Sequence, residues 1–185
     1  HEEVVDDARR YLELAEAESG TIPHPVPYEH VWGEALGELR RRHPDARIAN
    51  LETAVTRSDA AWPGKGIHYR MNPRNVAVLA AAGLDACALA NNHVLDWGYE
   101  GLSETLATLH EAGIRVAGAG AGLAAARAPA VISFAHGRRV LLFSAATGDA
   151  GVPESWSARN DRPGVHRLAD LSTGTIERIA DDVAR

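Results

Sequence analysis

The stretch Leu84–His93 reads Leu-Asp-Ala-Cys-Ala-Leu-Ala-Asn-Asn-His, a mostly apolar run that ends in polar residues. A short apolar run bounded by turn residues is typical of a strand, and Gly83 stands directly before this one. The preceding segment, Pro73–Ala81, has proline in its first turn and this glycine as its stop, which predicts a helix. We therefore predict a strand over Leu84–Ala90 whose carboxyl end carries polar side chains.

The same unit of helix, glycine and strand recurs along the chain. Ala82-Gly83-Leu84 is followed 30 residues later by Ala112-Gly113-Ile114, where a stripe of leucines precedes the glycine and a strand is predicted from Ile114 to Val116. Upstream, Arg47–Leu51 predicts another strand. Strands that alternate with helices form parallel sheets with right-handed crossovers. The sequence from residue 45 onward therefore predicts a βα core.

Helices at both ends and a hairpin complete the predicted fold. Helical spacing of apolar residues predicts helices over Glu3–Glu18, about Val31–Arg41, and Ser172–Arg185 with Ser172 as N-cap. One face of the last helix is predicted to be apolar: Ile176, Ile179, Ala180 and Val183. Ala130–Phe134 and Arg139–Phe143 flank a glycine turn, which predicts a β-hairpin. The predicted fold class is α/β, with a mixed, mostly parallel sheet flanked by helices.

Charge and composition narrow the function classes. The chain has 185 residues and a formal net charge of -6, and its basic residues are scattered apart from Arg40–Arg42 at a predicted helix end, where cations are favourable. Nucleic-acid binders depend on clustered positive charge, so we predict no nucleic-acid partner. Cys87 is the single cysteine, which excludes an internal disulfide, and its apolar surroundings predict a small buried core residue.

The sequence leaves the cellular location open. No apolar run approaches the roughly 20 residues of a membrane span, so nothing in it shows contact with a membrane. The chain begins His1-Glu2-Glu3 without Met, and we expect it to be an interior part of a longer protein. Cell-envelope and cytoplasmic locations are both compatible with it.

Two further patterns lack the context that chemistry would need. Gly118–Gly122 is rich in glycine, but Leu123 stands where a dinucleotide-binding fingerprint needs its third glycine, so we predict a flexible turn. Histidines outside the Asn-Asn-His run have no paired metal-binding spacing and are expected at the surface: His24, His30, His43, His136 and His166.

Polar residues close two of the predicted strands. Asn50-Leu51-Glu52 ends the first, and Asn91-Asn92-His93 ends the second. In open α/β sheets ligands collect beyond the carboxyl ends of strands, and neighbouring strands lie about 4.8 Å apart. Carboxylate, amide and imidazole groups suit a divalent ion, which lowers the pKa of a bound water to about 7. If the two strands are neighbours, the pattern predicts a ligand or metal site at this edge.

A purely structural explanation of the same residues stays open. Asn91 would cap a turn, Asn92 would adopt a left-handed backbone, and His93 would cap a helix that begins near Asp96. Spacing alone does not decide between this explanation and a site.

The loop after Glu52 carries three basic side chains within Lys65-Gly66-Ile67-His68-Tyr69-Arg70. Its glycines allow close approach to a ligand, and Lys65, His68 and Arg70 would suit an anionic substrate such as a phosphate or a polycarboxylate. The alternative is a solvated loop with ordinary surface charges.

Several motifs in one order carry a family resemblance. Asn50–Thr53, then Leu89–Gly98, Glu100–Leu102 and Gly118–Gly120, closely resemble the CapA family of capsule and poly-γ-glutamate synthesis proteins, and the match covers roughly Asp45–Thr147. That family is similar to a branch of the calcineurin-like metallophosphatases. The resemblance thus implies part of a metallophosphatase-like sandwich.

The resemblance also implies roles for individual residues. Glu52 and Asn92 would be metal ligands, and His93 would stabilise the transition state or protonate the leaving group. Asp96 would orient the loop that carries His93. The implied cofactors are divalent ions (Mn, Zn or Fe), and the implied partner is an anionic small molecule or a polymer like poly-γ-glutamate.

The sequence departs from the family pattern in two places. No Gly-Asp motif precedes Glu52, and the chain stops at Arg185 before the later His motifs. We therefore expect residues 1–185 to be one domain that is the incomplete N-terminal portion of a larger CapA-type domain, with residues 1–44 as a helical insertion, residues 45–185 as the βα core, and weak or absent metal binding of its own.

Two functions follow from the resemblance. One is a metal-dependent hydrolase or transferase that acts on an anionic substrate in capsule or poly-γ-glutamate synthesis. The other is a non-catalytic protein that binds the polymer or a partner of the capsule assembly machinery.

Overall fold

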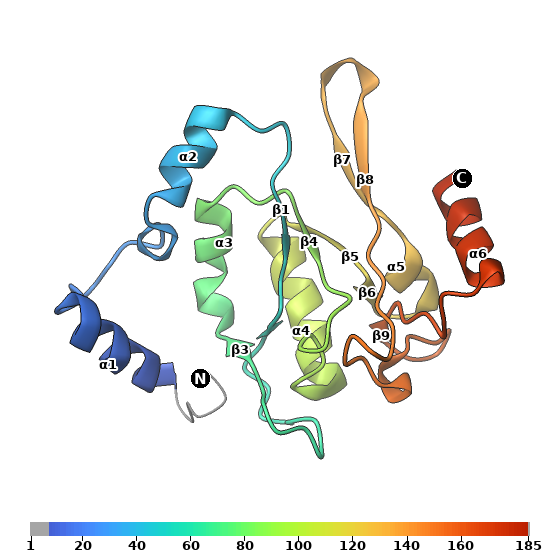
Figure 1. The fold of residues 1–185 in the computed structure, drawn as a ribbon, viewed down its shortest axis with the longest axis horizontal. Coiled ribbons are helices and arrows are strands. Elements are labelled where there is room, and N and C mark those ends of the chain that lie inside the picture. Colours follow the sequence, from blue (N-terminus) through green and yellow to red (C-terminus); the bar gives the residue numbers. More distant parts are fainter. Residues whose placement is uncertain (1–7, 185) are drawn as a thin grey trace.

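The core of the protein is a short parallel sheet, seen in a computed structural model that describes residues 8–184 (Figure 1). Its strands are β1 (Ile48–Asn50), β4 (Ala86–Ala88) and β5 (Arg115–Ala117), in the order β1-β4-β5. In the parallel register Ala49 lies opposite Cys87, and Cys87 opposite Val116. The predicted α/β fold and its parallel strands are therefore confirmed, although the strands β1 and β4 are shorter than the apolar runs that contain them.

The two faces of this sheet are covered by different elements, because successive side chains of a strand point to opposite faces. Cys87 belongs to the larger apolar cluster, which includes leucines of α3 (Ala77–Ala81) and α4 (Gly98–Glu111). Ala86 belongs to a smaller cluster with Ala117 and Ile132 of the hairpin. Helices thus cover one face and the base of the hairpin covers the other.

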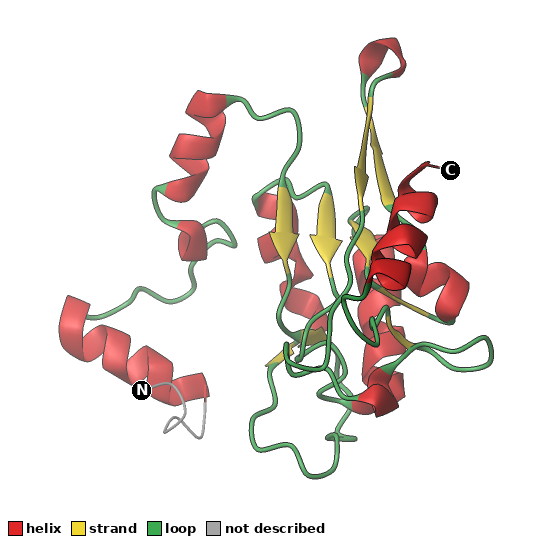
Figure 2. Ribbon diagram, turned by 45° about the vertical axis from the view of Figure 1, so that its right-hand side comes forward, coloured by secondary structure: helices red, strands yellow, loops and turns green. Residues whose placement is uncertain are grey.

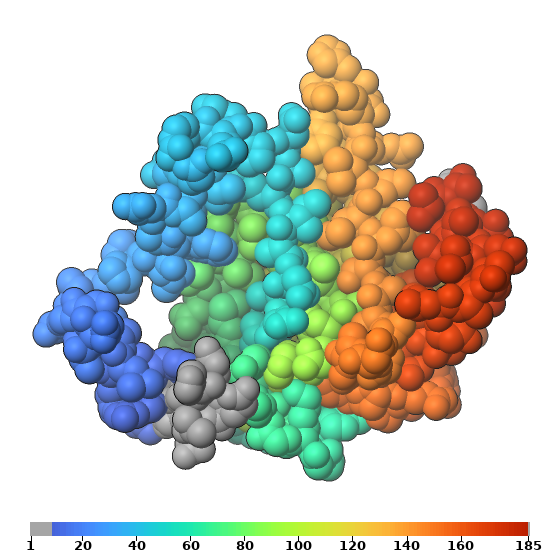
Figure 3. All heavy atoms as spheres, in the orientation of Figure 1, coloured from blue at the N-terminus to red at the C-terminus, as the bar shows by residue number. Residues whose placement is uncertain are grey.

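The predicted hairpin is present and protrudes from the body of the protein. Strands β7 (Ala130–Ser133) and β8 (Arg139–Leu142) pair antiparallel around a 3₁₀ turn over Ala135–Gly137. The base packs on the sheet, while the tip stands clear at the top of Figure 3 (light orange). The sheet content is therefore mixed, as predicted.

Two small strand pairs were not predicted. Strand β2 (Ala54–Val55) pairs parallel with β3 (Arg70–Met71), and β6 (Ala119–Gly120) pairs antiparallel with β9 (Gly164–Val165). The prediction of a flexible turn over the glycine-rich segment is wrong, because β6 is buried. A Cβ at Gly120 would lie 2.6 Å from the backbone nitrogen of Ala126, so close packing requires this glycine.

The remaining helices are arranged around this core (Figure 2). Their bounds are α1 (Ala8–Ser19), α2 (Ala35–Arg42), α5 (Leu123–Arg127) and α6 (Thr173–Ala184), with 3₁₀ turns over His30–Trp32, Pro73–Val76 and Glu154–Trp156. The part of the first predicted helix before Ala8 lies outside the described residues. Figure 1 shows α1 and α2 to the side of the sheet, with α1 farthest out. Among residues 8–184, no helix is long and apolar enough to cross a membrane.

Ser172 occupies the N-cap position of the last helix, as predicted, because α6 begins at Thr173 and the Ser172 carbonyl oxygen accepts from the N–H groups of Thr175 and Ile176, both at 3.0 Å. Its hydroxyl donates to Asp170 Oδ1 at 2.6 Å. This hydrogen bond makes the largest contribution to lowering the pKa of Asp170 to about 2. Two residues of the predicted apolar face, Ile176 and Val183, are exposed, whereas Thr175, which lies outside that face, is buried. The helix therefore turns a partly polar side toward the protein.

Two predictions about single residues have opposite outcomes. Cys87 is fully buried, and burial raises the pKa of its thiol to about 11, so the prediction of a small buried core residue is confirmed. The prediction of a surface position is wrong for His166, which is partly buried with Nδ1 3.1 Å from the carbonyl oxygen of Ser144. The other four histidines in that group are exposed, as predicted.

Candidate functional site at the carboxyl ends of β1 and β4

The two polar strand ends lie side by side because β1 and β4 are neighbours in the sheet. Asn91 joins them: its Nδ2 donates to Asn50 Oδ1 at 3.1 Å and to the carbonyl oxygen of Leu51 at 2.9 Å. Its Oδ1 accepts from the backbone N–H groups of His93 and Val94, both at 3.1 Å. Asn91 therefore caps the turn after β4, as the structural explanation predicted.

The other two parts of that structural explanation are wrong. Among the described non-glycine residues, only His43 and His136 have positive φ, so Asn92 is not left-handed. Helix α4 begins at Gly98 with Trp97 at its N-cap, which places His93 outside the cap. Local backbone geometry thus explains Asn91 but neither Asn92 nor His93.

A fully buried carboxylate, Asp96, is the centre of the site. Its Oδ2 lies 2.8 Å from His93 Nδ1 and accepts from the backbone N–H of Tyr69 at 2.6 Å. Its Oδ1 lies 2.8 Å from the ammonium of Lys65, at an angle outside hydrogen-bond geometry, so that contact is an ion pair. A buried carboxylate needs such partners because desolvation of an unpaired charge is costly.

The contacts of the His93 ring define its orientation. In a neutral imidazole, the tautomer whose Nδ1–H donates to the carboxylate of Asp96 has its lone pair on Nε2. Nε2 has no hydrogen-bond partner among residues 8–184. The ring of Tyr69 stacks on the imidazole with centroids 4.1 Å apart and 21° between the planes. The imidazole is therefore held on one edge and one face.

Tyr69 is a residue of the candidate site that the sequence did not indicate. It lies between His68 and Arg70 in the loop that we singled out for its cations, and a tyrosine at an arbitrary loop position carries no signal of its own. Both its backbone N–H and its ring contact the Asp96 and His93 pair. Only the fold of the loop reveals this.

The three predicted substrate-binding side chains all help to hold their own loop. Lys65 pairs with Asp96, and His68 Nε2 lies 3.0 Å from the carbonyl oxygen of Trp62. Arg70 lies over the ring of Trp97 at 4.2 Å, and its Nη1 pairs with Asp59 at 2.8 Å. Of the three, Lys65 alone contacts the His93 and Asp96 pair, at 3.3 Å from Nδ1 and 2.8 Å from Oδ1.

Within residues 8–184, no hydrogen bond joins the two predicted metal ligands, Glu52 and Asn92. Glu52 is exposed beyond β1 and accepts from Asn50 Nδ2 at 3.1 Å. Asn92 lies against Gly151, where an added Cβ would come within 3.0 Å of its own Cβ, and its amide has no hydrogen-bond partner in the described part of the chain.

These residues have the donor chemistry of a divalent-ion site but not the number of donors. Such ions take four or more ligands, and across residues 8–184 no three His, Cys, Asp or Glu side chains converge. Glu52 and Asn92 therefore amount to part of a ligand set at most.

The fold and the site define a class of protein: an α/β protein with a polar site beyond the carboxyl ends of adjacent parallel strands, built around a buried His and Asp pair. The chain belongs to the family of the bacterial capsule synthesis protein PGA_cap, whose family model matches residues 5–185. The resemblance to the CapA family is thereby confirmed.

Known relatives agree with this family. A probable polyglutamine synthesis accessory protein of Mycobacterium tuberculosis is 47% identical over 183 residues, which cover 99% of this chain and 47% of that protein. The PGA biosynthesis protein CapA of Bacillus subtilis is 28% identical over 125 residues, which cover 67% of this chain and 32% of that protein. The chain thus spans about half the length of the mycobacterial relative it matches.

Proposed function

We propose that the full-length protein is an accessory protein of capsule or poly-γ-glutamate synthesis. We further propose that the site around His93 and Asp96 at the carboxyl ends of β1 and β4, called the strand-edge site below, carries out hydrolysis or group transfer on an anionic substrate. Family membership and the names of the relatives support the pathway. The observation that carries the chemical part is the His93 imidazole, held by Asp96 on one edge and by Tyr69 on one face.

This arrangement suits proton transfer. With Nδ1–H donated to the Asp96 carboxylate, Nε2 is the atom that would accept a proton from the substrate or return one to a leaving oxygen. Asp96 would act as a positioning residue that fixes the tautomer and the ring orientation. Lys65 would balance the charge of the buried carboxylate. These three residues are a preassembled unit from two different loops.

Basic side chains at the same edge of the sheet support the proposal of an anionic substrate. Lys65 and His68 are half-buried, whereas Arg70 is exposed, with its Nη1 paired to the exposed Asp59 and its guanidinium on the face of Trp97. We propose that Arg70 meets an anionic group of the substrate directly, and that Lys65 and His68 shape the loop around it.

We also propose a divalent ion, Mn, Zn or Fe, as the cofactor of the full-length protein. Glu52 and Asn92 would hold it together with ligands from other parts of that protein. A bound ion of this kind supplies an activated water or polarises a substrate oxygen. Glu52→Gln and Asn92→Ala should each lower the metal content of the purified full-length protein, whereas Glu111→Gln, on the exposed end of α4, should leave it unchanged.

The test of the catalytic proposal compares two histidines of the same edge. The full-length protein would be assayed on a chromogenic phosphate ester and on γ-linked glutamate oligomers. His93→Ala should lower kcat by about 10²- to 10⁴-fold, because the proton-transfer group is lost. His68→Ala removes a histidine that contacts Trp62 and should cost much less. Activity that survives both His93→Ala and chelation would contradict the proposal.

A second candidate function is non-catalytic binding of an acidic polymer. It is favoured by the placement of Lys65, His68 and Arg70 on one loop at the edge, since such a row suits a polyanion without any reaction. It predicts tight binding of γ-linked glutamate oligomers that Arg70→Gln weakens, with no turnover of either substrate.

A further inference from the structure

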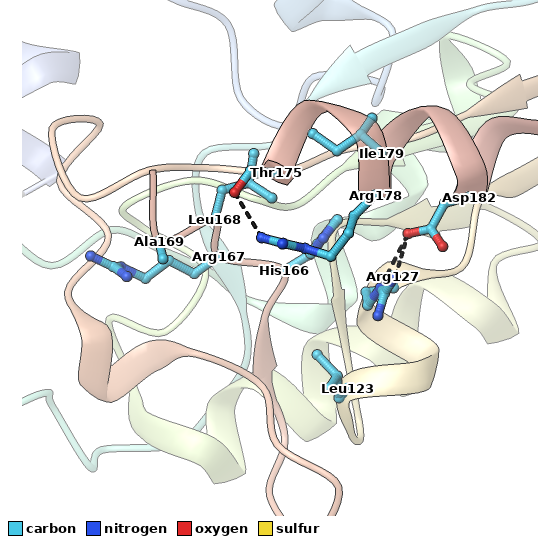
Figure 4. A pocket seen from close by; sticks show the side chains of 10 residues that line it. All are labelled: Leu123, Arg127, His166, Arg167, Leu168, Ala169, Thr175, Arg178, Ile179 and Asp182. Atoms are coloured by element: carbon cyan, nitrogen blue, oxygen red, sulfur yellow. Dashed lines mark hydrogen bonds and ion pairs between the residues drawn. The ribbon is translucent and has the colours of Figure 1, made fainter. Parts of the chain in front are cut away.

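A cavity of about 220 Å³ lies away from the strand-edge residues, between α5, α6 and the segment after β9. Figure 4 shows Arg178 reaching across its middle, with Arg127 beside Asp182 and Arg167 extending to the other side. The guanidinium groups of Arg178 and Arg127 and the carboxylate of Asp182 therefore lie on the same side of the cavity, whereas the guanidinium of Arg167 lies near Val152 and Gly148. The excess of positive charge stands out in a chain whose formal net charge is -6.

The pairing of these groups leaves positive charge in the cavity. Arg127 donates to Asp182 Oδ2 through Nε at 3.2 Å and Nη2 at 2.5 Å. Arg178 donates through Nη2 to the hydroxyl of Thr175 at 2.7 Å, and Arg167 donates through Nε to the carbonyl oxygen of Val152 at 2.9 Å. Among residues 8–184, neither Arg178 nor Arg167 has a carboxylate within ion-pair distance.

One carboxylate outside the cavity lining moderates this charge. Asp170 accepts from the Thr175 hydroxyl at 2.7 Å, and Arg178 is among the groups that lower the pKa of Asp170. The result is a chain of contacts from Arg178 through Thr175 to Asp170, in which the arginine still makes no direct ion pair.

The orientation of α6 is the second observation. The residues of α6 that line the cavity are Thr175, which is buried, Ile179 and Asp182, which are half-buried, and Arg178, which is exposed. Ile176 and Val183 are exposed as well. A surface helix ordinarily turns its apolar stripe inward. Here Arg178 lines the cavity and is also exposed, so a ligand from solvent can reach its guanidinium.

We propose that this cavity binds a small oxyanion, a carboxylate or phosphate group, held by the guanidinium group of Arg178, which has no carboxylate partner of its own within the described residues. The planar guanidinium fork matches both kinds of anion. This site is separate from the strand-edge site, so the proposal does not depend on the function proposed above.

His166 lines the cavity and is a natural reporter of the bound anion. Burial is the main cause that lowers the pKa of its ring, and Nδ1 is engaged with the Ser144 carbonyl oxygen. An anion in the cavity would favour the charged imidazolium and raise the pKa of His166. Two charged groups face the ring: Arg127 lowers the pKa of His166, and Asp182 raises it.

The experiment uses full-length protein with inorganic phosphate and glutarate as probes. Calorimetry should show saturable binding of one anion per protein, and NMR should show a higher pKa of His166 in the presence of the anion that binds. Arg178→Gln should weaken binding at least about tenfold. Arg40→Gln removes the same charge from an exposed position on α2 and should have no effect. Saturable binding of phosphate alone would mean that the site takes a phosphate group, and saturable binding of glutarate alone would mean that it takes a carboxylate. Binding of both would mean that it accepts either group.

Two outcomes would overturn the proposal. One is that neither anion binds or shifts the His166 titration of the wild-type protein, a readout that needs no variant to fold. The other is an equal loss of affinity in Arg40→Gln and Arg178→Gln, which would mean non-specific attraction. Arg178→Lys, which keeps the charge but not the fork, should retain part of the affinity.

Discussion

At the scale of single residues, Asp96 organises the candidate site. Its carboxylate contacts His93, Lys65 and the backbone N–H of Tyr69, and it has no exposure to water. A buried carboxylate stabilises the local fold while its charge is balanced by its partners. If the carboxylate is removed, each of these partners stays partly buried without its hydrogen bond or opposite charge, which costs free energy.

Asp96→Asn should therefore destabilise the protein by about 3 kcal/mol, since it removes the charge that balances Lys65. Urea denaturation of the full-length protein measures this. Asp59→Asn is the matched control: that carboxylate also pairs with a cation, Arg70, but its side chain is 91% exposed, so the cost should stay below about 1 kcal/mol. Equal costs for the two variants would mean that Asp96 is not the organising group.

At the scale of elements, the glycines divide into those that packing requires and those that it tolerates. Strand β6 lies so close to α5 that Gly120 has no room for a side chain. Gly37 lies inside α2, where an added Cβ would meet nothing within 4 Å. The same chemical change should therefore have opposite effects at the two positions.

Gly120→Ala should destabilise the protein by about 2 kcal/mol, because the added methyl group would collide with the backbone of Ala126 and Ala125. Gly37→Ala should be neutral or stabilise by up to about 1 kcal/mol through helix propensity. Thermal unfolding of the two variants and the wild type would measure the change in stability of each variant. A loss of stability on Gly37→Ala would show that this part of α2 is packed in the full-length protein.

At the scale of the whole molecule, the protein has a dense centre and a loosely attached margin. Leu102 and Leu109 of α4 are fully buried, whereas Tyr11, Leu12 and Leu14 of α1 are exposed. Local opening costs little where few apolar contacts must be broken.

Backbone amides of α4 should exchange with solvent at least about 100-fold more slowly than those of α1 in the full-length protein. Hydrogen exchange followed by mass spectrometry compares the segments Gly98–Glu111 and Ala8–Ser19 directly. Equal protection of both segments would mean that the apolar side chains of α1 are covered by another part of the full-length protein.

The sequence by itself determined the α/β class, the parallel strands and the edge at which the polar residues lie. These follow from local patterns: an apolar run such as Leu84–Ala90 seeks burial, glycines such as Gly83 and Gly113 end helices, and parallel strands place their carboxyl ends together. The family resemblance also came from contiguous motifs, so it needed no knowledge of contacts.

Tertiary structure alone decided how the side chains at that edge are used. Lys65 and Tyr69 reach Asp96 from a loop about thirty positions away in the sequence, and the Arg178 cavity joins segments that no local pattern connects. Sequence periodicity predicts which face of an element is apolar, but it does not predict which neighbour covers that face. The inward side of α6 and the burial of His166 were therefore fixed by packing between distant segments.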